Sequence, residues 1–338
     1  ALGRLDSLAN TLPSPHILVR PFIRQEAVLS SRIEGTRASL NDLYVYEATQ
    51  LSYLEPATDV REVHNYVKAL DYGIARLSSL PVSLRLIREI HAELMEGGRG
   101  EHLTPGEFRR SQNWIGPPGS TLESARFVPP PVEEMHAALD DLEKYIHASL
   151  DLPPLVQSAL IHYLFEAIHP LLDGNGRIGR LLIVLLLIEW GSISQPWLYL
   201  SAFFETHRTA YYDHLLAVSQ RGEWEAWLAF FLEGIQDQSE DAVLRIKRLQ
   251  RLRLKYHLLL QKERAVDRLM QAIDVLFERP ILGIRQMEAA MSIPYRSAQR
   301  YVEKLENLGI LREVTGRARN RLYQADEILT VLGGSPEV

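Results

Sequence analysis

With 338 residues, the chain is long enough for two or more domains, and its 46% apolar and 24% charged content is typical of a soluble globular protein. It contains no cysteine, which excludes disulfides and thiolate metal sites. The net charge of −6 is uneven, because residues 241–325 carry 18 Lys and Arg against 9 Asp and Glu. This basic third predicts either a nucleic-acid partner or a solvated helix face.

The longest apolar run, LLIVLLLI, is too short to span a membrane, and the N-terminus shows no signal-peptide pattern. We therefore expect a cytoplasmic protein with no membrane partner.

The N-terminal region, residues 1–80, is expected to be helical after a short arm. Three prolines favour an extended arm over residues 1–22. Apolar spacing then predicts a helix over about residues 23–35, with Gly35 as its stop. The prolines of the arm are Pro13, Pro15 and Pro21.

Helical spacing continues in residues 41–54 and 59–77, and Ser83 is expected to cap the next helix. The segment 104–131 differs, because it is rich in Gly, Pro and Ser and contains short β-prone pieces. It predicts a hairpin over residues 112–128, with a plain surface loop as the alternative.

Residues 81–235 are predicted to form a helical core, in which Pro131 and Pro153 begin helices. Residues 236–264 contain neither Gly nor Pro and predict a connector helix. The remaining residues, 265–338, are expected to form a separate small domain.

A glycine-rich segment, HPLLDGNGRIGR at residues 169–180, lies between two apolar helical stretches. Its N–H groups stand at the start of the second helix, where backbone donors and the helix dipole favour an anion. Arg177 and Arg180 share a helix face and suit phosphate oxygens. Asp173 is a candidate Mg²⁺ ligand, and His169 is a candidate general base. These are the parts of a phosphoryl- or nucleotidyl-transfer site.

Successive N–H groups around Gly174, Asn175 and Gly176 are expected to form the phosphate nest. With Gly179 these glycines also spell G-x-G-x-x-G, the dinucleotide fingerprint, but that fingerprint requires a preceding strand and the preceding residues have helical spacing. A purely structural loop is a second alternative. A di-iron site is a third, because two E-x-x-H pairs occur, Glu133 with His136 and Glu166 with His169.

The glycine-rich segment resembles the signature of the Fic family, H-P-F-x-(D/E)-G-N-G-R-x-x-R, with Leu171 where Phe is usual. The likeness extends over roughly residues 10–240. It implies a mainly α-helical bundle that transfers AMP from ATP to a hydroxyl side chain of a target protein. His169 would be the base, and Asp173 would hold Mg²⁺ between the phosphates. The retained Gly-Asn-Gly favours AMP transfer over phosphorylation, while AMP removal by the same site stays open.

The resemblance also assigns residues outside the signature. The family has a β-hairpin flap, here residues 112–128, that pairs with the target peptide. Its nucleotide-bordering segment corresponds to Ser124, Ala125, Arg126 and Phe127. A tyrosine pair near the adenine corresponds to Tyr211 and Tyr212, and Ser219 falls where some relatives contact the base.

The family's inhibitory motif, (S/T)-x-x-x-E-(G/N), fits Ser30, Glu34 and Gly35. The resemblance implies that Glu34 pairs with Arg180 in the resting state. The expected ATP-binding residues are Glu34, Ser124, Ala125, Arg126, Phe127, Asp173, Gly174, Asn175, Gly176, Arg177, Arg180, Tyr211, Tyr212 and Ser219.

The basic segment 265–325 holds three helical patterns and then two β-prone pieces around Gly316, an order that resembles a winged helix. Winged helices bind DNA or proteins, and both roles stay open. The recognition helix would carry Tyr295, Arg296, Ser297, Gln299 and Arg300, and the wing would carry Arg317, Arg319 and Arg321.

Two functions are therefore weighed. The first is an AMP transferase that uses ATP and Mg²⁺, is restrained by Glu34 and can modify itself. The second is a winged-helix DNA-binding regulator whose nucleotide site is a sensor. A homodimer is a further candidate assembly.

Overall fold

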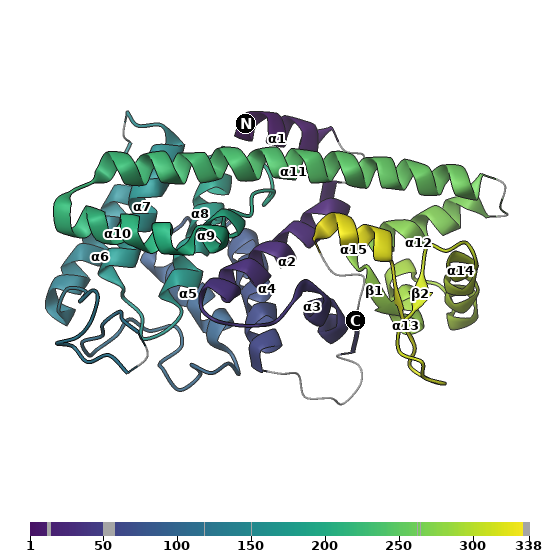
Figure 1. The fold of residues 1–338 in the computed structure, drawn as a ribbon, viewed down its shortest axis with the longest axis horizontal. Coiled ribbons are helices and arrows are strands. Elements are labelled where there is room, and N and C mark those ends of the chain that lie inside the picture. Colours follow the sequence, from purple (N-terminus) through teal and green to yellow (C-terminus); the bar gives the residue numbers. More distant parts are fainter. Residues whose placement is uncertain are drawn as a thin grey trace.

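The computed structural model is mainly helical and describes residues 1–11, 15–49, 58–117, 119–149, 151–261, 263 and 265–333. Figure 1 shows a long molecule in which helix α11, Trp224–Leu260, runs along one side from the helical core to a small C-terminal domain. No described helix combines the length and the apolar character needed to cross a membrane.

The helices before α11 are α1 Leu2–Asn10, α2 Pro15–Ile33, α3 Leu40–Thr49, α4 Thr58–Arg76, α5 Leu84–Met95, α6 Val132–His147, α7 Pro154–Ile168, α8 Asn175–Glu189, α9 Ser201–Thr206 and α10 Arg208–Arg221. After α11 follow α12 Val266–Glu278, β1 Ile281–Gly283, α13 Ile284–Met291, α14 Tyr295–Asn307, β2 Arg312–Glu313, β3 Leu322–Gln324 and α15 Asp326–Leu332.

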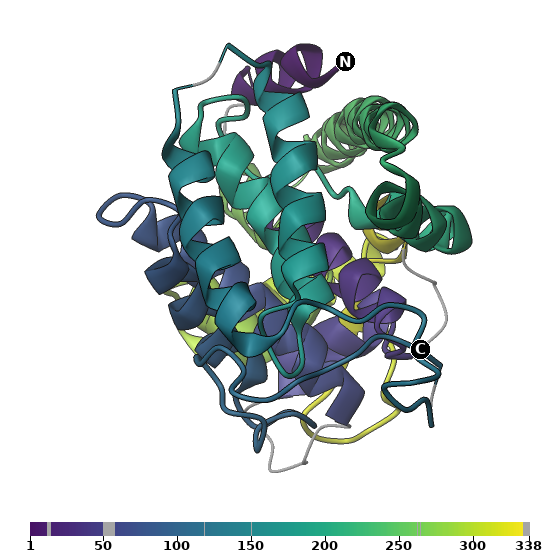
Figure 2. The same cartoon turned by 90° about the vertical axis from the view of Figure 1, so that its left-hand side faces the viewer.

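The core is built around α8, which is buried over almost its whole length because its apolar residues cover every face. Helix α7 packs against α8, and α6 packs against α7. Figure 2 looks along the long axis, and these teal helices stand side by side there. The run LLIVLLLI is therefore the centre of a globular core.

Helix starts and stops follow several of the predicted signals. The Ser83 hydroxyl caps α5 by accepting from the Leu86 amide. Pro131 and Pro153 stand at the N-caps of α6 and α7. Gly35, with φ +95°, follows the end of α2 in a conformation that favours glycine.

The predicted extended arm over residues 1–22 is wrong. Residues 2–10 form α1, and α2 begins at Pro15 and contains Pro21. A proline at a helix start leaves no amide unsatisfied, and the burial of neighbours such as Phe22 and Ile23 offsets the hydrogen bond that Pro21 cannot make. Pro13 lies outside the described residues.

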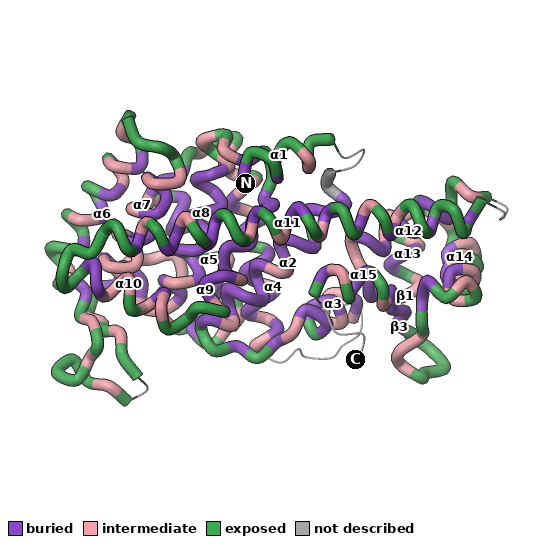
Figure 3. The backbone as a smooth tube through the Cα atoms, turned by 45° about the horizontal axis from the view of Figure 1, so that its top comes forward, coloured by how far each residue is buried: buried purple, intermediate pink, exposed green. Residues whose placement is uncertain are grey.

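The expected connector is also different, because α11 is one helix of 37 residues that includes the last core segment. Gly234 lies inside it, where an added Cβ would approach the Phe203 ring to 2.6 Å. The close packing of α11 against Phe203 therefore requires glycine at position 234, and this glycine does not break the helix. Figure 3 shows the buried and exposed turns alternating along α11, so one face packs and the other meets solvent.

The C-terminal domain contains a three-stranded antiparallel sheet in the order β1-β3-β2, beside α12, α13 and α14. The second helical pattern of this segment covers residues 281–291, but residues 281–283 form strand β1, in which Leu282 is fully buried and pairs with Tyr323 of β3. The domain packs on the rest of the chain, because Gln286 donates to the Ala48 carbonyl and Arg20 of α2 pairs with Glu278 of α12.

Candidate active site

His169 ends α7 in a left-handed backbone conformation, with φ 47° and ψ 59°. Pro170 follows, and a proline disfavours helical backbone in the residue before it. The left-handed region is uncommon for residues other than glycine and is found at functional sites. The helix thus ends at His169.

The His169 imidazole is neutral. Its Nδ1 lies 3.3 Å from the Glu166 carbonyl oxygen, which can only accept, so Nδ1 carries the hydrogen. Nε2 therefore keeps its lone pair. Burial lowers the pKa of His169 to about 4, so this nitrogen is available as a base at neutral pH.

The loop between α7 and α8 is closed by the Asn175 side chain, which accepts from the Leu171 amide and donates to the Leu171 carbonyl, both at 2.8 Å. Gly174, with φ 82°, turns the chain into α8. The first hydrogen bond onto the start of α8 is donated by the Ile178 amide, so the preceding N–H groups of its first turn point outward. N–H groups in such a position can bind an anion.

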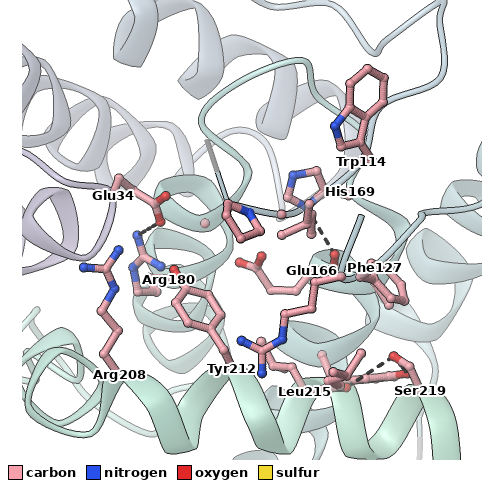
Figure 4. A pocket seen from close by; sticks show the side chains of 18 residues that line it. Glu34, Trp114, Phe127, Glu166, His169, Arg180, Arg208, Tyr212, Leu215 and Ser219 are labelled. Carbon is pink, nitrogen blue, oxygen red and sulfur yellow. Dashed lines mark hydrogen bonds and ion pairs between the residues drawn. The ribbon is translucent and has the colours of Figure 1, made fainter. Parts of the chain in front are cut away.

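Arg180 is buried against the end of α2. Its Nε donates to the Ser30 hydroxyl at 2.9 Å, and its Nη2 donates to the Ser30 carbonyl at 3.0 Å and to Glu34 Oε1 at 2.6 Å. Burial opposes the charge of Glu34, yet the Arg180 guanidinium holds the pKa of that carboxyl below its usual value. The expected pair of Glu34 with Arg180 is therefore present, as Figure 4 shows, and Ser30 contacts Arg180 as well.

A glycine at position 176 is required by this contact. A Cβ there would lie 2.2 Å from Glu34 Oε1 and 2.9 Å from Arg180 Nη1. The carboxylate thus lies directly over the first turn of α8, where an anion would otherwise bind.

A cavity of about 540 Å³ opens beside these groups (Figure 4). It brings together eight of the predicted site residues, which are Glu34, Arg126, Phe127, His169, Gly176, Arg180, Tyr212 and Ser219. Eight predicted residues do not line it, which are Ser30, Ser124, Ala125, Asp173, Gly174, Asn175, Arg177 and Tyr211.

Two of these residues, Arg177 and Tyr211, contact other side chains instead of the cavity. Arg177 lies 3.4 Å from both Glu62 and Asp173, so its expected place beside Arg180 at one phosphate site is not seen. Tyr211 is buried, and its hydroxyl lies 2.8 Å from Nε2 of His162. It is a core residue, and of the pair only Tyr212 faces the cavity.

The predicted hairpin is present as one antiparallel bridge between Ile115 and Phe127. Ser124 is exposed and its hydroxyl accepts from the Thr121 amide, which holds it in the turn away from the cavity. Arg126 pairs with Asp213 of α10, so the hairpin closes over the cavity mouth.

Sequence reasoning missed several lining residues, above all Glu166 and Arg208. Glu166 Oε1 is buried with no hydrogen-bond partner among the described atoms, and burial raises the pKa of this carboxyl to about 7. Its only sequence signal was the E-x-x-H spacing, which suggested a metal. Other lining residues that were missed are Trp114, Ile115, Gly116, Pro117, Tyr163, Ala167, Leu215 and Leu216.

A neutral base, the start of helix α8 with the Glu34 carboxylate over it, and a buried guanidinium thus surround one cavity. This combination defines a site of the phosphoryl- or nucleotidyl-transfer class. A dinucleotide fingerprint is excluded, because the helix α7 and not a strand precedes the glycines.

Comparison with known proteins identifies the family. The model for the Fic/DOC family N-terminal region matches residues 1–75, and the Fic/DOC family model matches residues 81–187. The chain therefore belongs to the Fic/DOC family.

Similar curated proteins carry the name protein adenylyltransferase Fic. The one from Culex quinquefasciatus is 26% identical over 242 residues, which cover 68% of this chain and 45% of that protein. The one from Drosophila grimshawi is 27% identical over 177 residues, which cover 50% of this chain and 33% of that protein. The chain spans less than half the length of these relatives.

Solved structures agree on the fold. A Fic family protein from Desulfovibrio desulfuricans G20 superposes with a TM-score of 0.61 and 19% identity, covering 96% of this chain and 93% of that one. Fic-1 from C. elegans superposes with a TM-score of 0.53 and 20% identity, covering 73% and 71%. The fold is thus the mainly helical Fic fold.

Proposed function

We propose that the protein transfers AMP from ATP to a hydroxyl side chain of a target protein. The observation that carries the proposal is the neutral His169 imidazole beside the first turn of α8, in a cavity of nucleotide size. The names of the similar adenylyltransferases support it.

In the proposed reaction the target oxygen attacks the α-phosphorus while Nε2 of His169 takes its proton. A phosphorus–oxygen bond forms to the target, the bond to the β-phosphate bridge breaks, and pyrophosphate leaves. General-base assistance of this kind typically contributes about 10²–10⁴-fold. The first turn of α8 would bind phosphate oxygens, and Arg208 adds a second cation at the cavity.

Mg²⁺ fits this site through Asp173. Magnesium is commonly held by one or two carboxylates together with substrate phosphates and water, and the Asp173 side chain is 40% exposed directly before α8. When bound, the ion would neutralise phosphate charge. The chain's own contribution is to fix the Asp173 backbone: the buried His91 accepts from the Gly106 amide through Nδ1, so its Nε2 donates to the Asp173 carbonyl. The Asp173 carboxylate itself accepts from the Gly174 amide at 2.6 Å and lies 3.4 Å from Arg177.

We further propose that Glu34 restrains the enzyme. Its carboxylate occupies Arg180, which would otherwise meet a terminal phosphate of ATP, and it lies against Gly176. ATP could still enter, but its α-phosphorus would be turned away from in-line attack. The target peptide would pair with the hairpin 112–128, and Tyr212 and Ser219 would border the base.

The test is incubation of the purified chain with labelled ATP and Mg²⁺, alone and with whole-cell lysate, followed by mass spectrometry. The expected result is an AMP adduct on a hydroxyl side chain, absent in His169→Ala. If instead AMP leaves a pre-modified lysate protein, the same site removes AMP, and Glu34 would position the attacking water.

A second candidate function concerns the C-terminal domain, which we propose to be a winged helix that binds duplex DNA. Exposed arginines on α14 and between β2 and β3 have no carboxylate partner among the described ion pairs, and they suit phosphates. They are Arg296, Arg300, Arg317 and Arg319. Salt-dependent binding of the full chain to duplex DNA would support a regulator that senses nucleotide, while capture of a protein would favour the other use of this fold.

A further inference from the structure

Arg109 is a fully buried arginine that the proposed reaction does not use. It forms no ion pair among the described residues, and burial lowers the pKa of its guanidinium. All the partners of its side chain are backbone carbonyl oxygens, which are those of His169 at 3.1 Å, Ser111 at 3.1 Å and Pro130. Burying a charge without a counter-ion is costly, so the three carbonyls must compensate for it.

These carbonyls come from two separate parts of the site. Ser111 and Pro130 flank the hairpin 112–128, so one guanidinium joins the two ends of the hairpin. The third carbonyl belongs to His169, the proposed base. Arg109 therefore connects the segment proposed to hold the target with the residue proposed to accept the target's proton.

The backbone repeats the connection. The Arg109 amide donates to the Pro170 carbonyl at 2.8 Å. Asn113, at the start of the hairpin, donates through Nδ2 to the carbonyls of His169 at 3.2 Å and Leu171 at 3.0 Å. Three consecutive carbonyls of the loop are thus bonded to residues 109–113.

This arrangement also explains how His169 keeps its left-handed conformation. Such backbone is strained in a residue other than glycine and persists only where its surroundings enforce it. The His169 carbonyl accepts from both Arg109 Nε and Asn113 Nδ2. The two bonds fix the peptide plane that follows the His169 Cα, and so the backbone that carries the imidazole.

We propose that Arg109 is a positioning residue that fixes the hairpin and His169 in one register, so that a hydroxyl held on the hairpin arrives at Nε2. The inference rests on the proposed AMP transfer. A guanidinium is required because its planar fork sends donors in three directions at once, whereas an ammonium on a flexible stem cannot reach all three carbonyls.

Loss of the fork would leave ATP binding intact but misalign the base. A displacement of about 1 Å can cost about 10²-fold in rate. We therefore expect Arg109→Lys to lower the limiting rate of AMP transfer by about 10²-fold, while the ATP concentration at half-saturation changes by less than about threefold.

The experiment uses the full-length chain with Glu34→Gly as parent, so that activity is measurable, and its own hydroxyls as acceptor. Rates with labelled ATP give the limiting rate and half-saturation, and hydrogen exchange by mass spectrometry follows peptides covering 111–130 and 165–175. The matched control is Arg24→Lys, which alters another buried arginine that instead has a carboxylate partner, Glu47.

The expected result is faster exchange in both peptides of Arg109→Lys together with the lower limiting rate, and neither change in Arg24→Lys. If Arg109→Lys shows the same limiting rate and the same hydrogen exchange as the parent, the proposal is overturned. Faster exchange in 111–130 alone would also overturn it, because Arg109 would then anchor the hairpin without reaching His169.

A second variant covers the case in which Arg109→Lys does not fold. Asn113→Ala removes the second donor to the His169 carbonyl and the bond to the Leu171 carbonyl but keeps Arg109, so smaller changes in the same direction at both peptides are expected. Unchanged exchange at 165–175 would overturn the linkage. If the parent transfers no AMP at all, the proposed function fails, but exchange still decides whether Arg109 joins the two segments.

Discussion

The Glu34–Arg180 pair should inhibit AMP transfer, and the free energy of this inhibition can be estimated from the exposure of the two side chains. Arg180 is 1% exposed and Glu34 is 33% exposed, so the pair lies between a buried one and a surface one. Breaking a buried pair costs about 3–5 kcal/mol, and exposed pairs contribute about 0–1 kcal/mol. An intermediate value of about 2 kcal/mol corresponds to roughly a 30-fold change in an equilibrium constant.

Glu34→Gly should therefore raise AMP transfer, including self-modification, by about 30-fold. The substitution is structurally mild, because position 34 lies beyond the end of α2 and already precedes a glycine. Ser30→Ala should raise the rate less, because it removes one hydrogen bond between Arg180 and an uncharged hydroxyl and leaves the ion pair.

The assay compares initial rates with labelled ATP, with Arg32→Ala as control. Arg32 lies on the same turn of α2, but its pair with Glu205 is exposed and 4.0 Å long, so its loss should leave the rate unchanged. If Glu34→Gly is no faster than wild type on itself and on lysate, Glu34 does not restrain the enzyme.

Three further predictions follow from the site and the C-terminal domain. His169→Ala should lower AMP transfer by about 10²–10⁴-fold and leave ATP binding, measured by calorimetry, within about threefold; an unchanged rate would exclude His169 as the base. Glu166 has a folded-state pKa of about 7 against an ordinary value of 4.5, so the folded protein binds this proton more tightly and loses stability as the pH rises from 4.5 through 7. Glu166→Gln should therefore increase the free energy of unfolding at pH 8 by up to about 3 kcal/mol and have little effect below pH 4.5. If denaturant titrations show the same effect of the substitution at both pH values, the raised pKa is refuted. Finally, Arg296→Ala with Arg319→Ala should reduce the salt slope of duplex DNA binding by about 2 in fluorescence anisotropy, and a full chain that binds no DNA at low salt would contradict this role.

Features encoded in short stretches of sequence could be predicted. The loop at residues 169–180 forms as expected because its glycines and Asn175 make contacts within a few residues. The pairing of Glu34 with Arg180, which lie far apart in the chain, came from the family resemblance and not from local pattern.

Features decided by tertiary packing could not be predicted. Pro21 suggests an arm, yet its neighbours gain more by burial in a helix than the missing hydrogen bond costs. Helical spacing makes Arg177 and Arg180 neighbours, but Glu62, on a helix far away in the sequence, pairs with Arg177. Tyr211 and Tyr212 are adjacent, and only the fold decides that His162 holds the first in the core.

The identity of the group transferred from ATP tests the central claim most directly. Glu34→Gly and Glu34→Gly with His169→Ala are each incubated with Mg²⁺ and ATP labelled at either the α- or the γ-phosphate. We predict that the α-label becomes attached to protein only in the single variant, and that the γ-label leaves as pyrophosphate. Attachment of the γ-label, or equal α-labelling of both variants, would contradict AMP transfer with His169 as the base.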